Sequence, residues 1–77
     1  MKKYAVAIIS LIDNDNKVFI ESAIDELSAM KKAVISFIPE ESERDFMPLL
    51  NKAKSSDELK GYMFDCEIGI SDALLIS

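Results

Sequence analysis

The sequence contains no histidine and no tryptophan, one cysteine, one arginine and two glycines. Without histidine there is no imidazole base, no Ser-His or Cys-His nucleophile pair, and none of the commonest metal ligand. A single cysteine cannot form an internal disulfide, nor can it supply the four ligands of a structural zinc site. The isolated Gly61 and Gly69 do not make a phosphate-binding loop. We therefore expect no catalytic residue, no metal and no cofactor.

Apolar runs in the chain are short, and the longest one stands near the amino terminus. It covers residues 4–12, follows two lysines and ends in the polar stretch 13–16. A membrane span needs about 18 apolar residues, and a secretory signal needs a small-residue cleavage site, which does not follow here. Because a lone cysteine is also typical of a reducing compartment, we expect a cytoplasmic protein.

A chain of 77 residues has room for one domain, which we place over residues 1–77. Domains of this size bury only about 60% of the surface of the unfolded chain, so their stability margin is thin. Neither disulfides nor a structural metal can supplement the core here. Self-association is the remaining means, and we expect a homo-oligomer.

Two strands joined by a tight turn are expected in the first third of the chain. Residues 4–12 are apolar in both alternating sets, which is typical of a strand covered on both faces. Residues 17–24 alternate more clearly between two faces. The polar residues 13–16 between them favour a hairpin turn, because Asn and Asp tolerate the geometry of a tight loop.

Caps and apolar spacing predict helices in the middle of the chain. Asp25 is a candidate N-cap, and residues 26–38 carry an apolar stripe at helical spacing that ends before Pro39. The stripe consists of Leu27, Met30, Val34, Phe37 and Ile38. A second, short helix is expected to start near Asp45. Pro48 limits it, either by falling in its first turn or by breaking a longer helix.

The last third of the chain is ambiguous between helix and strand. After a predicted linker over residues 52–56, Ser56 is a second candidate N-cap. Residues 62–67 fit both helical and alternating spacing, so periodicity alone cannot separate helix from strand there. The cap favours a helix to about Cys66, followed by a strand over about residues 68–76.

The order of these elements predicts an α+β fold of the type β-β-α-(α)-α-β. If the last strand pairs with the first, the sheet has three strands in the order 2-1-3, with the last strand antiparallel to the first and all helices on one face. The other face would be bare, and a second copy of the chain is the expected cover. The bare set in the first strand would be Ala5, Ala7, Ile9 and Leu11, or whichever set faces away from the helices.

Negative charge is concentrated in the second half of the chain. Residues 1–39 hold five lysines and five acidic residues, whereas residues 40–77 hold four basic and nine acidic residues. Binding to a nucleic-acid backbone needs clustered Lys and Arg and is not expected. An acidic half fits either docking on a basic protein surface or a solvated surface that keeps the protein soluble. The candidate partner-binding residues are Glu40, Glu41, Glu43 and Asp45.

Other candidates for chemistry have simpler structural explanations. Cys66 has an acidic neighbour on each side, which disfavours a reactive thiolate. The acidic pairs lie in polar runs expected to be solvated, so no acid/base pair is predicted. Residues 13–16 resemble the start of a calcium loop, but Val18 and Ile24 stand where such a loop needs glycine and a bidentate glutamate.

Arg44 is the only arginine and lies among acidic residues. An arginine in such a cluster is usually an ion-pair partner of its neighbours. Its planar group is also the best one in the chain for holding a phosphate or a carboxylate, provided that the fold brings lysines beside it. The candidate ligand-binding set is Arg44, Lys31, Lys32, Lys52, Lys54 and Lys60.

Three stretches carry a resemblance that covers the whole chain: MKKYAVAIISLIDND, ESAIDELSAMKKAV and DELKGYMFDCEIGISDALLIS. The chain resembles small orphan proteins encoded by tailed bacteriophages. The resemblance implies a non-enzymatic host-takeover or anti-defence role in the cytoplasm of an infected bacterium. Two functions are expected from it. One is an inhibitor that binds a host or defence-system protein stoichiometrically, and the other is a homo-oligomeric sponge that sequesters a nucleotide immune signal.

Overall fold

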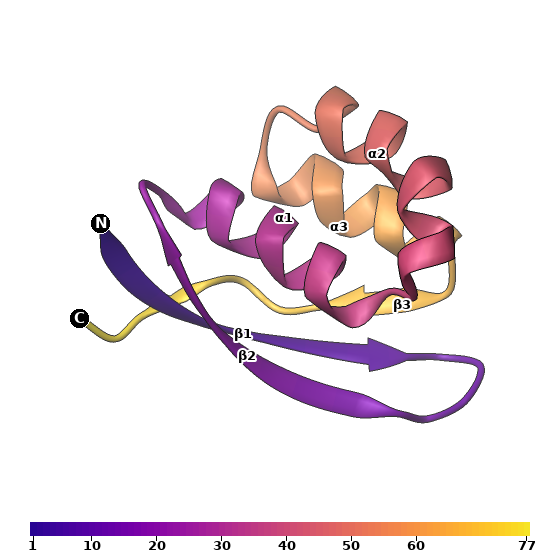
Figure 1. Ribbon diagram of the computed structural model, residues 1–77, viewed down its shortest axis with the longest axis horizontal. Helices are drawn as coiled ribbons and strands as arrows, with labels where there is room; N and C mark the ends of the chain where they lie inside the picture. The colour runs from indigo at the N-terminus through magenta and orange to yellow at the C-terminus, as the bar shows by residue number, and fades with distance from the viewer.

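The protein places three helices on one face of a small antiparallel sheet (Figure 1). The computed structural model describes all 77 residues. The strands are β1 (Lys2–Ser10), β2 (Asn16–Ala23), β3 (Ile68–Ile70) and β4 (Leu74–Leu75). The helices are α1 (Glu26–Phe37), the short 3-10 helix η1 (Glu40–Ser42), α2 (Glu43–Lys52) and α3 (Ser56–Asp65). The predicted α+β class is confirmed.

The strand β1 is the centre of the sheet. It pairs antiparallel with β2 along its length, from Lys2↔Ala23 to Ile9↔Asn16. On its other side it pairs antiparallel with β3 and then with β4. The predicted order β2-β1-β3 is confirmed, and the helical segment is the connection that carries the chain from β2 to the far side of β1.

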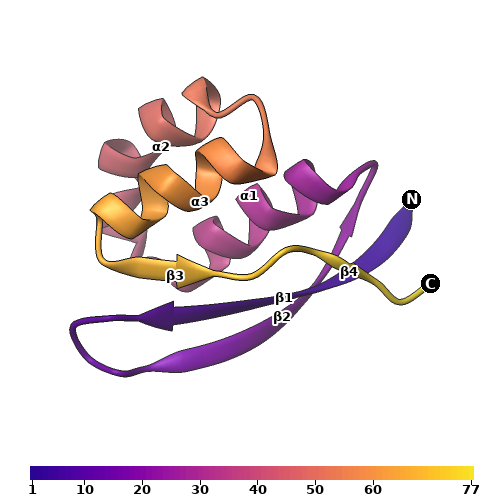
Figure 2. The same cartoon turned by 180° about the vertical axis from the view of Figure 1, so that it is seen from behind.

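The last strand differs from the prediction because it consists of two short strands with a gap at residues 71–73 (Figure 2). In this gap the Ser71 hydroxyl accepts a hydrogen bond from the Ala7 N–H at 2.9 Å. The Ser71 N–H donates to the Ala7 carbonyl, also at 2.9 Å. The Ser71 hydroxyl therefore takes the place of a backbone carbonyl as acceptor for β1. This interrupts the backbone hydrogen bonds between the last strand and β1, although the chain stays beside β1.

The hairpin tip is formed by the polar stretch, as predicted. The strands end at Ser10 and resume at Asn16, so β1 lies two residues earlier in the chain than predicted and Leu11 and Ile12 belong to the turn. Asn14 has a φ of 56°, in the left-handed region that Asn tolerates better than most residues. Its N–H donates to the Ser10 carbonyl at 2.9 Å, which closes the turn.

The helix α1 begins where predicted and ends within one residue of the prediction. The Asp25 side chain accepts a hydrogen bond from the Ser28 N–H at 2.8 Å, which confirms the N-cap. Ile38, the C-cap, has an extended backbone, as the residue before Pro39 prefers. The predicted stripe has three buried and two half-buried members: Met30, Val34, Ile38, Leu27 and Phe37.

Both predictions for Pro48 are wrong, because α2 continues through it from Glu43 to Lys52. A proline at this position has no N–H to donate to the carbonyl of Arg44 four residues earlier. Pro48 and Arg44 are exposed, so water can reach that carbonyl and the helix tolerates the missing bond. The helix also begins earlier than predicted, and the linker shortens to residues 53–55.

The segment that was ambiguous between helix and strand is helical through Asp65. Its N-cap is Ser55, so the prediction of Ser56 as the cap is wrong. The Ser55 hydroxyl accepts from the Glu58 N–H at 3.2 Å, and the Glu58 carboxylate accepts from the Lys54 N–H at 2.7 Å. This reciprocal arrangement satisfies two donors at the start of α3.

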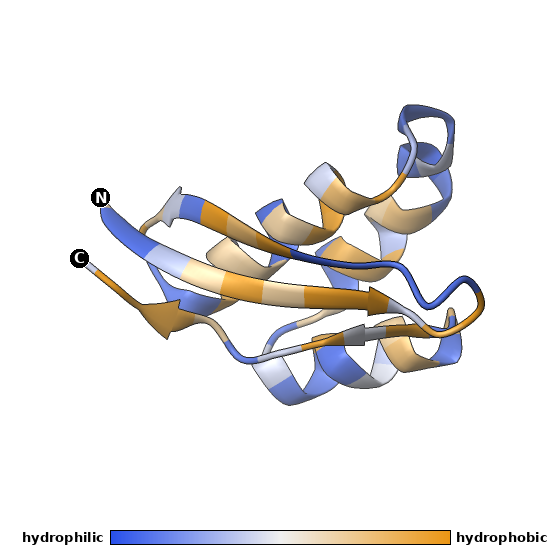
Figure 3. Cartoon of the chain, turned by 90° about the horizontal axis from the view of Figure 1, so that it is seen from below, coloured by the Kyte–Doolittle hydropathy of each residue, from blue (hydrophilic) through white to orange (hydrophobic).

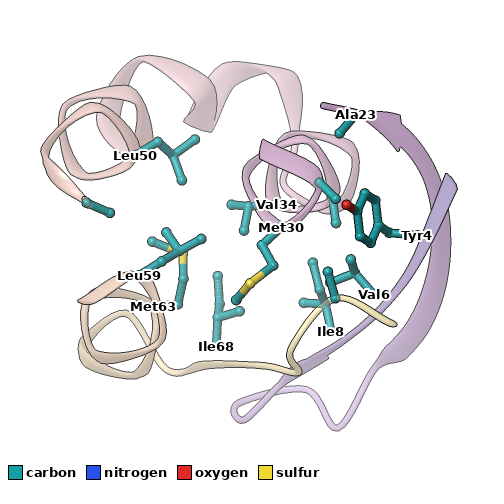
Figure 4. Close-up of a cluster of buried hydrophobic side chains, with 14 of the residues drawn as sticks. Tyr4, Val6, Ile8, Ala23, Met30, Val34, Leu50, Leu59, Met63 and Ile68 are labelled. Atoms are coloured by element: carbon teal, nitrogen blue, oxygen red, sulfur yellow. The ribbon is translucent and has the colours of Figure 1, made fainter. Parts of the chain in front are cut away.

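The core lies between the helices and the covered face of the sheet (Figure 4). All 15 buried residues are hydrophobic, and the hydroxyl of Tyr4 is the only polar side-chain group among them. Tyr4, Val6 and Ile8 of β1 form its floor. Phe19 of β2 packs at its edge against Phe37 of α1, with ring centroids 6.3 Å apart. None of the helices has the length and apolar composition of a membrane-spanning segment.

Replacing Asp25 by alanine is expected to lower the melting temperature at pH 7, because α1 loses its cap. The backbone N–H and the side chain of Ser28 hold the pKa of Asp25 below its ordinary value of 3.8. The cap therefore stabilises the fold above pH 3.8, and this contribution is lost as pH falls through the lower pKa of the folded state. Thermal melts at pH 7 and pH 2 should show the difference between native and Asp25→Ala protein shrinking at pH 2.

Asp25→Asn is the control for this prediction, because an amide oxygen still caps the helix but does not titrate. If native and Asp25→Ala proteins differ equally at both pH values, ionised Asp25 does not stabilise α1.

Candidate functional site

Acidic side chains gather around η1 and the start of α2. They line a hollow of about 690 Å³, which we call the acidic hollow. Its lining residues are Glu40, Glu41, Glu43, Arg44, Asp45 and Met47. The four acids of this set are those predicted to bind a partner. The four acids come together because η1 ends at Ser42 and α2 begins at Glu43, so all four lie within two consecutive helical turns.

The carboxylates of the acidic hollow are not neutralised within the protein. The only ion pair in the structure joins Lys60 Nζ to Asp72 Oδ1 at 2.6 Å, on another part of the surface. Arg44 therefore does not form the ion pair with its acidic neighbours that is usual for an arginine in such a cluster. The acids do have a structural role as well, since they stand in the first turns of η1 and α2, where the helix dipole favours negative charge.

The acidic hollow lies on the outer side of the helical layer. In Figure 1, α2 is the helix farthest from the sheet. Leu50 is the only residue of α2 that is fully buried, and Arg44 and Asp45 are exposed. Leu50, with the half-buried Phe46 and Leu49, therefore holds α2 against the core, and the acidic side of the helix is left to solvent.

The six cations predicted to bind a ligand do not converge within one chain. Of the six, only Arg44 lines a hollow of the surface, and that hollow is acidic. Lys52 lies over the ring of Tyr62, with Nζ 5.4 Å from the ring centroid. Lys32 Nζ donates a hydrogen bond to the Ser22 carbonyl. These lysines attach helices to their neighbours instead of forming an anion site.

Lys60 also serves a structural contact. Its hydrogen bond with Asp72 raises the pKa of Lys60 above its ordinary value of 10.5, so the ammonium stays charged. The pair joins α3 to the gap between β3 and β4, at the surface. Exposed pairs of this kind contribute little to stability.

Sequence reasoning missed a third grouping of side chains, at the hairpin tip. Asp13 and Asp15 border a hollow of about 220 Å³ together with Cys66 and Glu67, against the end of α1. No group of three or more Cys, Asp or Glu side chains is placed to hold a metal ion. The only signal in the sequence was that both segments which border this hollow, residues 13–15 and 66–67, contain acids. The two segments are far apart along the chain, so the sequence did not indicate that they meet.

The sheet has one face that carries no helix, on the side opposite to α1, α2 and α3. This face is mostly apolar. Figure 3 shows the sheet from this side, with the helices behind it. We call this surface the open face. Strand register places these residues on it: Lys3, Ala5, Ala7, Ile9, Asn16, Val18, Ile20, Ser22, Gly69 and Leu74. Of the predicted bare set, Ala5, Ala7 and Ile9 lie on the open face, whereas Leu11 lies beyond the end of β1.

Small residues make a shallow depression in the open face. Its volume is about 500 Å³, and Ala7, Ile9, Val18 and Gly69 are among the residues that line it. A Cβ atom at Gly69 would lie 2.8 Å from Ile9 Cγ2, so the Ile9 side chain lies across the glycine. Glycine is favoured here because a Cβ atom would force the Ile9 side chain to move.

Comparison with known protein families, with curated proteins and with solved structures found no match to this chain.

Proposed function

We propose that this protein is a non-enzymatic binding protein that inhibits or sequesters a bacterial host or defence-system protein by stoichiometric binding. The observation that carries the proposal is the acidic hollow, where four carboxylates border one concavity and no ion pair neutralises them. The resemblance to small bacteriophage proteins supports a partner in the bacterial cytoplasm.

The electrostatics of the acidic hollow favour a basic protein surface as the partner. Carboxylates that are not paired internally produce a negative potential, and a concave surface concentrates it. A partner that presents Lys or Arg side chains, including a surface that normally holds nucleic acid, is complementary to this potential. Such complementarity speeds association and suppresses binding to acidic surfaces. Arg44, at the same hollow, can donate two hydrogen bonds to a carboxylate of the partner and so fix the orientation of the complex.

A nucleotide sponge is the alternative, and it has less support. A phosphate site needs several cations that converge, whereas Lys32, Lys52 and Lys60 make other contacts and Arg44 is surrounded by acids. A ligand at 100 times its Kd would stabilise the protein by about 2.7 kcal/mol, which a thermal melt detects readily. We expect no shift with any member of a panel of cyclic nucleotides, and a clear shift with one of them would favour the sponge.

Reversing the charge of the acidic hollow is expected to abolish partner binding. The variant combines Glu40→Lys, Glu41→Lys and Glu43→Lys, which turns three attractive charges into repulsive ones. Native and variant proteins are immobilised and exposed to bacterial lysate, and the retained proteins are identified by mass spectrometry. We expect a basic protein that native protein retains at low salt, that is released as salt screens the charges, and that the variant does not retain.

A matched control separates the acidic hollow from net charge. Asp15→Lys, Asp57→Lys and Asp65→Lys make the same change in net charge at exposed positions outside the hollow. The control should retain the same partner as native protein. Retention by the hollow variant, or equal loss from both variants, would show that the acidic hollow is not the binding site. Circular dichroism of both variants establishes that they are folded.

A further inference from the structure

The sheet has two apolar faces, and the helices cover only one of them. In β1, Tyr4, Val6 and Ile8 are buried under the helices, while the alternate residues Ala5 and Ile9 lie on the open face and are half-buried. A strand with apolar residues on both sides is typical of a sheet that is covered on both sides. A single chain therefore covers one apolar face of the sheet and leaves the open face uncovered.

The most exposed apolar residues of the open face lie on both sides of β1. Val18 and Ile20 of β2 are 67% and 56% exposed, and Leu74 of β4 is 66% exposed. Between them are the small residues that form the shallow depression. Contiguous apolar patches on the surface of a soluble chain are typically interaction sites, because leaving them in water is unfavourable.

The open face carries no acidic residue, although the chain has 14 of them. Glu21 of β2 pairs with Tyr4 and accepts a hydrogen bond from the Ser36 hydroxyl at 3.1 Å, so it lies on the helical side. Asp13 and Asp15 border the hollow against the end of α1. The only charged residue at an open-face register position is Lys3, near the start of β1, and a second cation, Lys17, borders the depression.

We propose that a second copy of the chain covers the open face, with the two sheets packed face to face. Two copies with a net charge of −5 repel each other wherever their acids meet. The open face is where they can approach without opposing any carboxylates, since packed sheets lie about 10 Å apart and the acids remain on the helical sides. An acid-free apolar face on a strongly acidic chain is therefore suited to self-association.

The size of the open face suits a dimer. An ordinary stable interface takes about 800 Å² from each partner. The chain has 4860 Å² of accessible surface, so such an interface needs about one sixth of it. The side of the body that carries the open face measures 31 × 22 Å, so the sheet and the residues around it together supply an area of this order (Figure 3). A dimer would also supplement a core that 77 residues alone make thin.

Face-to-face packing has a consequence for the rest of the surface. The open face and α2 lie on opposite sides of the molecule (Figure 1). The two acidic hollows of a dimer would therefore point outward, away from each other, and both would be free to bind. The dimer itself does not depend on what binds there.

Light scattering of the native protein is expected to give twice the chain mass of 8.6 kDa. Val18→Glu puts a carboxylate on the open face and should reduce the mass to that of one chain. Phe64→Glu is the matched control, because Phe64 is 66% exposed and belongs to α3 and not to a strand of the sheet, and this variant should remain dimeric. Circular dichroism shows whether each variant is folded.

A second measurement covers the case in which Val18→Glu does not fold. The melting temperature of a native dimer rises with protein concentration, because association stabilises the folded state by mass action. A native mass of 8.6 kDa with a melting temperature independent of concentration would overturn the proposal, and some other molecule would have to cover the open face. A folded Val18→Glu protein that is still dimeric would also overturn it.

Discussion

Leu59→Ala is expected to lower the free energy of unfolding by about 2–5 kcal/mol, because the lost methyl groups leave a cavity that the core cannot close. Leu59 has no exposed surface and lies in α3 where it faces the sheet across the core (Figure 4). A chain of 77 residues has a total stability of about 4–12 kcal/mol, so this one substitution removes a large part of it. Urea denaturation at a fixed protein concentration measures the loss.

Phe64→Ala is the control on the same helix. Phe64 is 66% exposed, and removing it should change the free energy of unfolding by less than about 0.5 kcal/mol. Similar losses for Leu59→Ala and Phe64→Ala would mean that α3 does not present the face with Leu59 to the sheet.

Val6→Asp is expected to leave the protein unfolded at pH 7. Val6 has no exposed surface, and it lies at the middle of the central strand. The core contains no charged side chain, and its only polar side-chain group is the hydroxyl of Tyr4, so no cation there can neutralise a buried carboxylate. Burial of an unpaired charge costs several kcal/mol, which is comparable with the whole stability of a domain of this size. Circular dichroism and proton NMR report the loss of structure.

The pH dependence of this variant identifies the cause. In an apolar core the neutral acid is favoured, so the pKa of the new carboxyl in the folded state is raised above about 3.9. The destabilisation should therefore be largest at pH 7 and decrease as pH falls toward 4. Ile12→Asp is the control, because Ile12 is 69% exposed in the hairpin turn and its replacement should leave the protein folded. Unfolding of both variants alike would contradict burial as the cause.

Structural elements that depend on residues close together in the sequence could be predicted from it. The polar stretch between two strands produced the hairpin, and Asp25 and Pro39 fixed the two ends of α1. The order of the strands followed because only β1 is apolar in both alternating sets. In each case the information lies within a few residues, or in a pattern that one element carries by itself.

Other features depend on contacts that the sequence does not display. The cap of α3 is not one of them, because Ser55 has a glutamate three residues later, Glu58, at the spacing of a capping box, whereas Ser56 has Leu59 at that position. The gap after β3 follows from the bond between Ser71 and Ala7, which are far apart in the chain. The helix continues through Pro48 because that side of α2 is exposed, which becomes clear only once the helices are packed.

The candidate sites divide in the same way. Glu40, Glu41 and Glu43 are close in sequence, so any turn would bring them together, and sequence reasoning could identify them. The lysines come from three separate helices and, for Lys54, from the linker before α3, so their positions depend on how these elements pack. Which alternating set of β1 is covered also required the placement of the helices.

The central claim is that a second copy covers the open face of the sheet. The most direct test is the exposure of methyl groups to a soluble paramagnetic agent, measured by NMR. The methyl groups of Val18 and Ile20 should be protected nearly as well as those of the buried Val6 and Ile8, while Ile12, which is 69% exposed in the hairpin turn, is strongly relaxed. If Val18 and Ile20 relax as strongly as Ile12, the open face is bare in solution and no second copy covers it.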